Sequence, residues 1–192
     1  MITINWGGVK KMYKNYLLNA HALVPEFDHF NKPYTIIVTS KGLTRVNLSP
    51  SKLIDTDLKE NGSSLKGAKE AAKATLETAS MHPILIPRLP LFHVWFPTES
   101  TRNDTCHYFA LHHVLKAKEN PLSSHSTIVI LRDGREVAVP VSKSKFKQLE
   151  YKASNYFAKV LFKQLISHSL SSKAEDKIVL KCAEQNENYL LD

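Results

Sequence analysis

The sequence predicts an α+β fold in a single domain, with antiparallel β-strands, a β-hairpin over residues 127–141 and a long amphipathic helix over residues 143–168. Three observations predict it. An Asp-Gly pair separates two runs of β-branched residues, which is typical of a hairpin. The segment that follows repeats apolar residues at helical spacing, and short apolar runs earlier in the chain alternate with turn residues, as in an antiparallel sheet.

The hairpin is the clearest local prediction. Asp133-Gly134 lies between TIVIL at 127–131 and EVAVPV at 136–141, and Asp-Gly favours a two-residue turn. The register that such a turn sets pairs apolar residues across the hairpin, Ile130 with Val137 and Ile128 with Val139. Pro140 has no backbone N–H to donate, so the second strand is expected at a sheet edge.

The first part of the chain predicts strands and two helices. Strands are expected over the short apolar runs 16–24, 34–38, 43–47, 91–96 and 107–115. Ser49 followed by Pro50 begins a helix over 50–61, and Gly62 ends it. A second helix follows Ser63-Ser64, with one apolar face formed by Leu65, Ala68, Ala72, Leu76 and Ala79.

The helix over 143–168 carries two stripes of side chains. Its apolar stripe, spaced to face a core, consists of Phe146, Leu149, Ala153, Phe157 and Val160. A lysine stripe lies beside it, formed by Lys145, Lys152, Lys159 and Lys163. Phe162 and Ile166 fall outside the apolar stripe, so we expect them to contact a second copy of the chain.

The charge balance favours a polyanionic partner. The formal net charge is +8 and the pI about 9.4. An excess of this size is typical of nucleic-acid binders, although many basic proteins bind no nucleic acid. No apolar run reaches the roughly 18 residues that span a bilayer, and two cysteines are too few for a disulfide framework. We therefore expect a cytoplasmic, nucleoid-associated protein without a membrane partner.

The two ends of the chain are expected to lie outside the domain. Residues 1–12 are predicted to be disordered or a mis-annotated start, because Gly7-Gly8 and the residues after it match what a translated ribosome-binding sequence would encode. Translation would then begin at Met12 and not at Met1. The domain is expected over 13–170, and a polar C-terminal tail over 171–192.

Cys106, His107, His112 and His113 invite a metal-site or thiol interpretation. In an extended strand Cys106 and His112 would share one face about 20 Å apart, with the other two residues on the opposite face, so four ligands would not converge. No GxSxG elbow and no glycine-rich phosphate loop is present. We therefore expect no metal, no cofactor and no enzymatic activity. A thiol or metal hydrolase that uses Cys106 and His107 is an interpretation that ranks third, behind two that involve nucleic-acid binding.

Basic side chains are better candidates for a functional site. Arg132 and Arg135 would face each other across the hairpin turn, where like charges destabilise unless solvent, Asp133 or a phosphate compensates. Such a tip suits a narrow minor groove, but it equally suits a solvated hairpin end. The other DNA-binding candidates are lysines on the two helices and an arginine in a loop: Lys145, Lys152, Lys159, Lys163, Lys66, Lys69, Lys73 and Arg102. Each stripe also fits a solvated helix flank.

A series of residues in register gives a resemblance to a known family. The series is Gly62-Ser63-Ser64, Lys69, Pro83-Ile84, Phe96-Pro97-Thr98 with Ser100 and Arg102, His113-Val114, and a helix that begins near 144–146. In order and spacing it resembles the bacterial competence transcription factor (ComK) family, from about Tyr16 to about Phe162. Tyr108 replaces a tryptophan that is common in that family, and the C-terminal region shows little likeness.

The resemblance implies a DNA-binding transcriptional activator of genetic competence, the state in which DNA-uptake genes are switched on. It would recognise AT-rich promoter boxes in double-stranded DNA, mainly through the minor groove and phosphate contacts, as a homo-oligomer (dimer or tetramer). RNA polymerase and a proteolytic adaptor are further implied partners, the latter reading an apolar segment such as Tyr189-Leu190-Leu191. The alternative is a basic nucleic-acid-binding module without promoter specificity, whose binding would be steeply salt-dependent.

Overall fold

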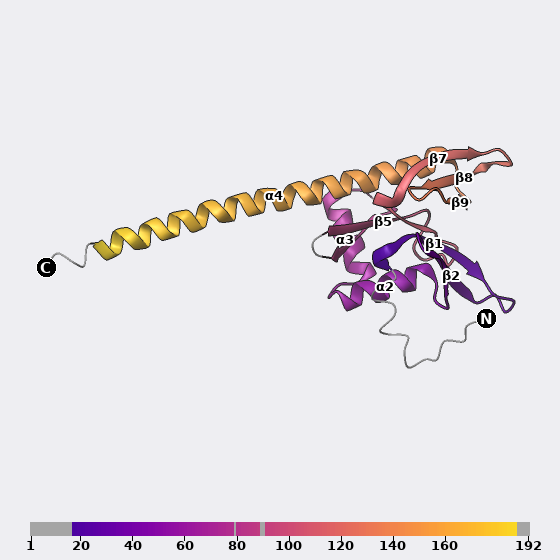
Figure 1. Ribbon diagram of the computed structural model, residues 1–192, viewed down its shortest axis with the longest axis horizontal. Helices are drawn as coiled ribbons and strands as arrows, with labels where there is room; N and C mark the ends of the chain where they lie inside the picture. The colour runs from indigo at the N-terminus through magenta and orange to yellow at the C-terminus, as the bar shows by residue number, and fades with distance from the viewer. Residues whose placement is uncertain (1–16, 79, 89–90, 188–192) are drawn as a thin grey trace. The chain divides into compact units, whose positions relative to one another are not determined.

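The computed structural model describes residues 17–78, 80–88 and 91–187 (Figure 1). Its elements are η1 (Leu17–Asn19), β1 (Ala20–Phe27), β2 (Pro33–Thr39), β3 (Gly42–Val46), α2 (Pro50–Glu60), α3 (Leu65–Leu76), β4 (Ile84–Arg88), β5 (Leu91–Pro97), β6 (Tyr108–Ala110), η2 (Leu111–His113), β7 (Val114–Asn120), β8 (Ser123–Leu131), β9 (Glu136–Val139) and α4 (Lys143–Glu187). This architecture confirms the predicted α+β class. The segment 1–12, predicted to precede the domain, lies outside the described residues.

The strands form two antiparallel sheets. The larger sheet has the order β3-β2-β1-β6-β5-β4, and the smaller has the order β7-β8-β9. In the larger sheet β6 pairs with β1 on one side and with β5 on the other. This short strand therefore joins the β1–β3 meander to the β4–β5 hairpin.

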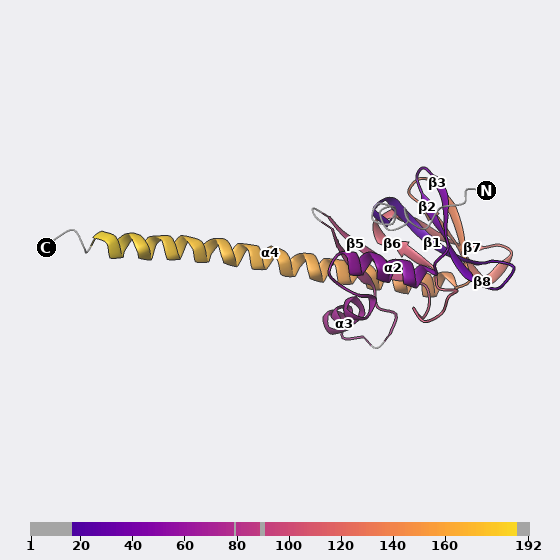
Figure 2. The same cartoon turned by 90° about the horizontal axis from the view of Figure 1, so that it is seen from below.

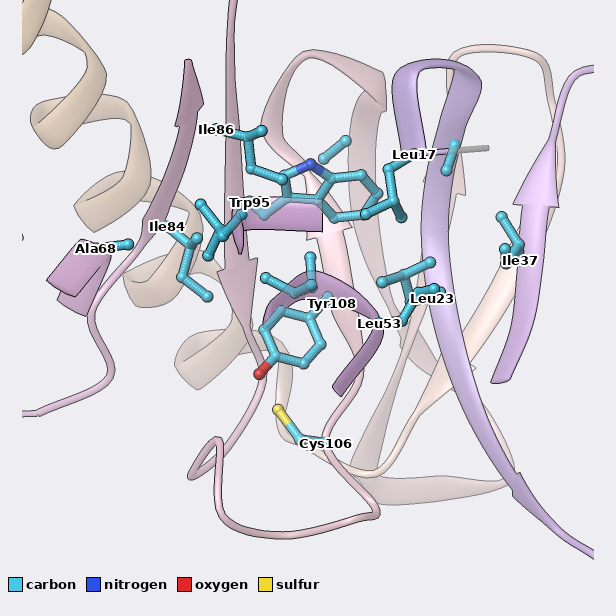
Figure 3. Packing of buried hydrophobic residues seen from close by; sticks show 14 of the residues in the cluster. Leu17, Leu23, Ile37, Leu53, Ala68, Ile84, Ile86, Trp95, Cys106 and Tyr108 are labelled. Atoms are coloured by element: carbon cyan, nitrogen blue, oxygen red, sulfur yellow. The ribbon is translucent and has the colours of Figure 1, made fainter. Parts of the chain in front are cut away.

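Helices α2 and α3 cover one face of the six-stranded sheet. Trp95 and Tyr108 from the sheet belong to one core cluster with Leu53 of α2 and Ala68 of α3 (Figure 3). Figure 2 shows α2 lying across the strands. Both helices begin where the sequence predicts: Pro50 occupies the first turn of α2, and the Ser64 hydroxyl accepts a hydrogen bond from the Gly67 N–H at the start of α3.

The first turns of α4 pack on the sheet's other face. Successive strand residues alternate between faces, so Phe96 and Phe109 point away from Trp95 and Tyr108. The Phe146 ring of α4 packs edge-on against both phenylalanines, with ring centroids 5.5 Å and 5.3 Å apart. Within the predicted apolar stripe Phe146, Leu149 and Ala153 are buried, whereas Phe157 and Val160 remain partly exposed. Tyr156, which was not assigned to the stripe, is buried as well.

Helix α4 continues beyond its predicted end near residue 168, as far as Glu187. The segment 143–187 contains no Gly or Pro, and a polar composition alone is not a helix stop. Most of the polar tail predicted over 171–192 is therefore helical. The chain divides into two compact units at Tyr156 and Phe157, and the α+β core belongs to the first. Among the described residues no helix has an apolar stretch that could cross a bilayer.

The predicted hairpin register is wrong by one residue. Val129 pairs with Val137, and Thr127 with Val139. The Leu131 N–H donates to the Arg135 carbonyl (2.8 Å) and the Gly134 N–H to the Leu131 carbonyl (2.9 Å), so the turn has three residues and not two. Gly134 adopts the left-handed conformation that closes such a turn, with φ +85°. The buried face of β8 accordingly carries Thr127, Val129 and Leu131.

The strand predicted over 107–115 is interrupted. Its first part is β6, but residues 111–113 form the 3-10 turn η2, and β7 begins at Val114. The strand predicted from residue 16 begins only at Ala20, after η1. Strand β4 and most of β7 were not predicted as strands, since prolines dominate the first region and charged residues the second.

Candidate nucleic-acid interface

The loop between β5 and β6 is fixed by its own polar side chains. Both Glu99 carboxylate oxygens accept hydrogen bonds of 2.6 Å, from the Asn103 amide and from the Thr105 hydroxyl. The Thr98 N–H donates to the His107 carbonyl at the base of the loop (3.0 Å). The exposed Arg102 side chain has no hydrogen bond or ion pair within the part of the chain that the structure describes.

This loop is bonded to both helices through Thr101. The Ser51 hydroxyl of α2 donates to the Thr101 carbonyl (2.8 Å), and its oxygen lies 2.8 Å from the Tyr108 hydroxyl. A hydroxyl has one proton, so Tyr108 is the donor in the second bond. Burial raises the pKa of the Tyr108 phenol, which keeps that proton in place. From α3, the Lys69 ammonium donates to the Thr101 hydroxyl (3.0 Å).

Arg102 and the α3 lysines thereby share a surface. Lys66 and Lys73 are exposed and lie one helical turn before and after Lys69, so the three lysines line one side of α3. The bond from Lys69 to Thr101 places Arg102 next to this row. We call Lys66, Lys69, Lys73 and Arg102 the α3–loop surface. The sequence suggested each residue separately, but not that a Thr101 contact joins them.

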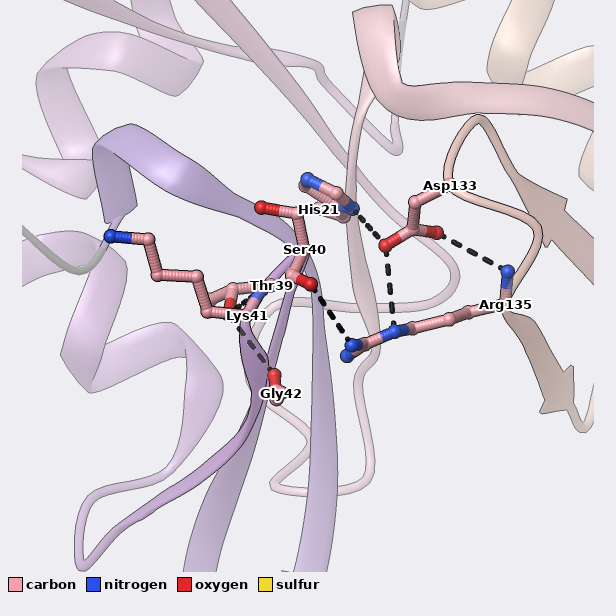
Figure 4. A network of polar contacts seen from close by, with 7 residues as sticks. All are labelled: His21, Thr39, Ser40, Lys41, Gly42, Asp133 and Arg135. Carbon is pink, nitrogen blue, oxygen red and sulfur yellow. Dashed lines mark hydrogen bonds and ion pairs between the residues drawn. The ribbon is translucent and has the colours of Figure 1, made fainter.

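The two hairpin arginines do not form a free pair. Figure 4 shows the Arg135 guanidinium reaching across to the larger sheet, where it donates to the Ser40 carbonyl (3.2 Å). Arg135 Nε also lies 3.5 Å from Asp133 Oδ2, and that oxygen lies 3.1 Å from His21 Nδ1 of β1. Arg132 Nε donates to the His112 carbonyl (2.7 Å). The turn is therefore anchored to the neighbouring elements, although each guanidinium keeps further N–H groups that could meet a phosphate.

Four histidines meet beside this anchored turn. The ring centroids lie 4.9 Å apart for His93 and His112, 4.2 Å for His112 and His113, and 3.7 Å for His113 and His21. Burial and the neighbouring imidazoles lower the pKa of both His112 and His113 to about 4, so these rings are neutral at pH 7. The described residues contain no group of three or more His, Cys, Asp or Glu side chains arranged to hold a metal ion. The expectation that His112 and His113 point to opposite faces of a strand was wrong, because they lie on η2.

The lysines of α4 have different surroundings. Lys145 is exposed at the start of the helix, while the Lys152 ammonium donates to the Ser80 carbonyl, and burial lowers its pKa. Lys159 and Lys163 are exposed in the second unit. In that unit Phe162 and Ile166 are also exposed, to 66% and 43%, and each directly follows an exposed leucine, Leu161 and Leu165 respectively.

Cys106 and His107 are structural residues. Both are buried, and the Cys106 thiol lies 3.5 Å from the Glu99 and His107 carbonyls. Burial raises the pKa of this thiol to about 11, so the nucleophilic thiolate is scarcely populated at neutral pH. The geometry offers no support for the hydrolase interpretation.

Comparison with known proteins agrees with the resemblance found in the sequence. The model of the ComK protein family matches residues 13–165, which include the complete α+β core and the α3–loop surface. Neither the curated proteins nor the solved structures gave a match. ComK proteins are transcription factors and not enzymes. Since the matched segment covers well over half of the chain, this protein belongs to the ComK family and has a role in competence-related transcription regulation.

Proposed function

We propose that this protein is a DNA-binding activator of competence genes that recognises AT-rich promoter boxes mainly through the minor groove and phosphate contacts. The observation that carries the proposal is the α3–loop surface. Its four basic side chains lie on α3 and on the loop between β5 and β6, which the hydrogen bond from Lys69 to Thr101 joins. Only Lys69 of the four has a hydrogen-bond partner within the described residues. That partner is the neutral Thr101 hydroxyl, so the full positive charge of the surface remains available to a polyanion.

The α3–loop surface is suited to contact the phosphate backbone of DNA. The backbone of the loop that carries Arg102 is fixed by Glu99 and linked to Ser51 and Lys69. A preorganised loop loses less entropy on binding. Arg102 can form two parallel hydrogen bonds with one phosphate, and the exposed lysines can neutralise the phosphates beside it.

The minor-groove part of the proposal rests on the remaining basic residues. AT-rich tracts have a narrow groove of strong negative potential that attracts arginine and lysine. Arg132, Arg135, Lys145 and Lys152 contribute positive charge to the first unit, although Arg135 also contacts Asp133. Shape and deformability of the DNA would then carry much of the specificity, because the base pattern of this groove is degenerate.

We further propose that the protein binds as a homo-oligomer through α4. Leu161, Phe162, Leu165 and Ile166 are all exposed within six consecutive residues. A cluster of this kind is unfavourable in water and typical of a contact surface. A symmetric dimer or tetramer would match repeated AT boxes. We also propose that the protein recruits RNA polymerase and is controlled by a proteolytic adaptor. Both proposals rest on the resemblance to the family, and no contact among the described residues supports them.

Fluorescence anisotropy tests the DNA proposal. The full chain is titrated against one labelled duplex with paired A-tract and T-tract boxes and against a GC-rich duplex of equal length, at several salt concentrations. We expect tighter binding to the AT duplex. Arg102→Ala should weaken binding to both duplexes and lower the salt slope by about one. Lys59→Ala is the matched control, since Lys59 pairs with Asp55 in α2 (2.7 Å) and lies outside the α3–loop surface.

The alternative function gives a different result in the same titration. A basic module without promoter specificity would bind both duplexes equally, with a steep dependence on salt. The observation that favours this alternative is the number of lysines on α3 and α4. Lysine side chains that contact phosphates do not distinguish one base sequence from another. Absence of binding at moderate salt would contradict both functions.

A further inference from the structure

The turn between β7 and β8 exposes one large apolar side chain at its tip. Asn120 pairs with Ser123, so Pro121 and Leu122 form the turn between the strands. Leu122 is 92% exposed, more than any other large apolar residue whose side chain the structure describes. Turns of this length favour Gly, Asn, Asp and Ser, so turn formation does not account for a leucine here. In Figure 1 this turn is the far end of the three-stranded sheet.

The tip has a fixed conformation. The Leu122 N–H donates to the Asn120 side-chain carbonyl (3.0 Å). The Asn120 amide in turn donates to the Ser126 hydroxyl (2.8 Å), which ties the turn to β8. Pro121 restricts the backbone further because its ring fixes φ. The backbone that carries Leu122 is therefore held in one conformation, so less conformational entropy is lost when the tip contacts a neighbouring molecule.

The strands behind the tip carry basic and small polar side chains. Lys116 and Lys118 on β7 are exposed, as are Ser123, Ser124 and His125 on β8. The nearby acids are matched: Glu136 pairs with Lys118 (2.8 Å) and Glu119 with Lys143 (3.5 Å). Both glutamates are thus neutralised by a lysine, and Lys116 of β7 keeps an unpaired positive charge within the described residues. Lysine and serine side chains are common partners of DNA phosphates.

We propose that Pro121 and Leu122 form a wedge that enters a base step from the minor groove and kinks the DNA. This proposal deepens the proposed function and rests on it. Proteins that bind the minor groove insert apolar residues such as Pro and Leu between base pairs, unstack them and bend the duplex. The groove is only about 6 Å wide in B-DNA, which admits a two-residue tip but not the two strands side by side.

The wedge also fits AT-rich DNA. TA steps unstack more easily than other steps, so a wedge favours sites that contain them without reading a base edge. The Leu122 side chain cannot form a hydrogen bond with a base. Its contribution to sequence specificity would come only from the energy needed to deform the base step. Arg102 and the lysines of the α3–loop surface would supply the phosphate contacts, and the wedge would supply the bend.

The test measures bending and unstacking in addition to affinity. The full chain is bound to an AT-box duplex that carries a donor and an acceptor dye at its ends and 2-aminopurine in a central TA step. We expect the wild type to shorten the end-to-end distance and to raise 2-aminopurine fluorescence. Leu122→Ala should abolish both signals, whereas Leu122→Phe should retain them. Affinity should change by no more than about tenfold, because the lost contact and the saved unstacking energy oppose each other.

A matched control separates the wedge from general loss of apolar surface. Leu43 is also an exposed leucine (68%), but it lies on β3 of the larger sheet, so Leu43→Ala should bend DNA as the wild type does. Bending and unstacking that survive in Leu122→Ala would overturn the wedge while leaving the proposed function intact. A wild type that does not bind the duplex at all would overturn the proposed function, and the wedge with it.

Discussion

The two turns of the three-stranded sheet differ in how they are held. The β8–β9 turn is charged, and its side chains are bonded back to β1, η2 and the β2–β3 turn: Asp133 to His21, Arg132 to the His112 carbonyl and Arg135 to the Ser40 carbonyl. The β7–β8 turn is apolar at its tip, and Leu122 has no such anchor. One turn therefore joins parts of the fold, and the other extends from it.

This difference shows why charge alone is an uncertain guide to a DNA contact. Arginines in a hairpin turn suggest a DNA-binding tip, but in the fold such arginines can serve as structural ties between sheets. The turn without charge has no hydrogen bond or ion pair to another part of the fold among the described residues. Four predictions follow from this comparison, beginning with the largest expected loss of stability at the anchored turn.

Removing the central carboxylate should release the anchored turn. Asp133→Ala removes the carboxylate that lies 3.1 Å from Nδ1 of the buried His21 and 3.5 Å from the Arg135 guanidinium. We expect a loss of about 1–3 kcal/mol in the free energy of unfolding, the usual range for a buried polar group without its partner. Urea denaturation measures it. Asp104→Ala, on the exposed loop after β5, is the control and should change stability by less than about 0.5 kcal/mol. Equal losses in both variants would mean that the turn is not anchored.

The histidine cluster should make the same junction sensitive to acid. The folded pKa of His112 and His113 is about 4, below the value of about 6.5 expected in the unfolded chain. The fold thus favours the neutral rings, and this stability is present above pH 6.5 and lost as the pH falls from 6.5 towards 4. Arg132 and the rings of His93 and His21 repel the added protons, while Asp133 attracts them.

Urea denaturation at pH 7, 6, 5 and 4 measures this loss. We expect about 1–2 kcal/mol, because solvent screens rings that are partly exposed. A double variant, His112→Asn with His113→Asn, should show a flatter profile over the same range. An unchanged profile in that variant would place the acid sensitivity elsewhere in the chain.

The backbone of the anchored turn should resist a side chain at Gly134. Its φ of +85° is disfavoured for residues with a Cβ, so Gly134→Ala should cost about 1 kcal/mol. Gly67→Ala is the matched control, because Gly67 is helical and its added Cβ would meet only the Ser64 hydroxyl at 3.4 Å. That substitution should stabilise α3 by up to about 1 kcal/mol. Thermal unfolding should therefore show opposite shifts, and a Gly134→Ala variant as stable as the wild type would contradict the turn geometry.

Most of the fold was predictable because its signals are local. Apolar runs give β1 and β2, and the Ser-Pro and Ser-Ser starts give α2 and α3. Most of strand β7 was missed because Lys116, Lys118 and Glu119 have no strand-like pattern, and pairing with β8 is what makes them a strand. The hairpin turn was placed correctly, but its length of three residues depends on tertiary ties that no local pattern shows.

The candidate site was predictable only in part, for a different reason. Lys69 and Arg102 stand out in the sequence as basic residues, but the Thr101 contact between them joins segments that are far apart in the chain. The histidine cluster unites β1, β5 and η2 in the same way. Leu122 gave no signal, because a single leucine in a polar stretch is ordinary until its exposure is known.

The smallest effect on stability should come from a substitution in the β7–β8 turn. The Leu122 side chain is 92% exposed, so Leu122→Ala removes almost no packing and should change the free energy of unfolding by less than about 0.5 kcal/mol. Urea denaturation beside Asp133→Ala gives the direct contrast between the two turns. A loss above 1 kcal/mol would show that Leu122 packs within the protein, and the wedge would then lose its basis. Preserved stability together with lost DNA bending would mean that this side chain acts on the bound DNA and not on the fold.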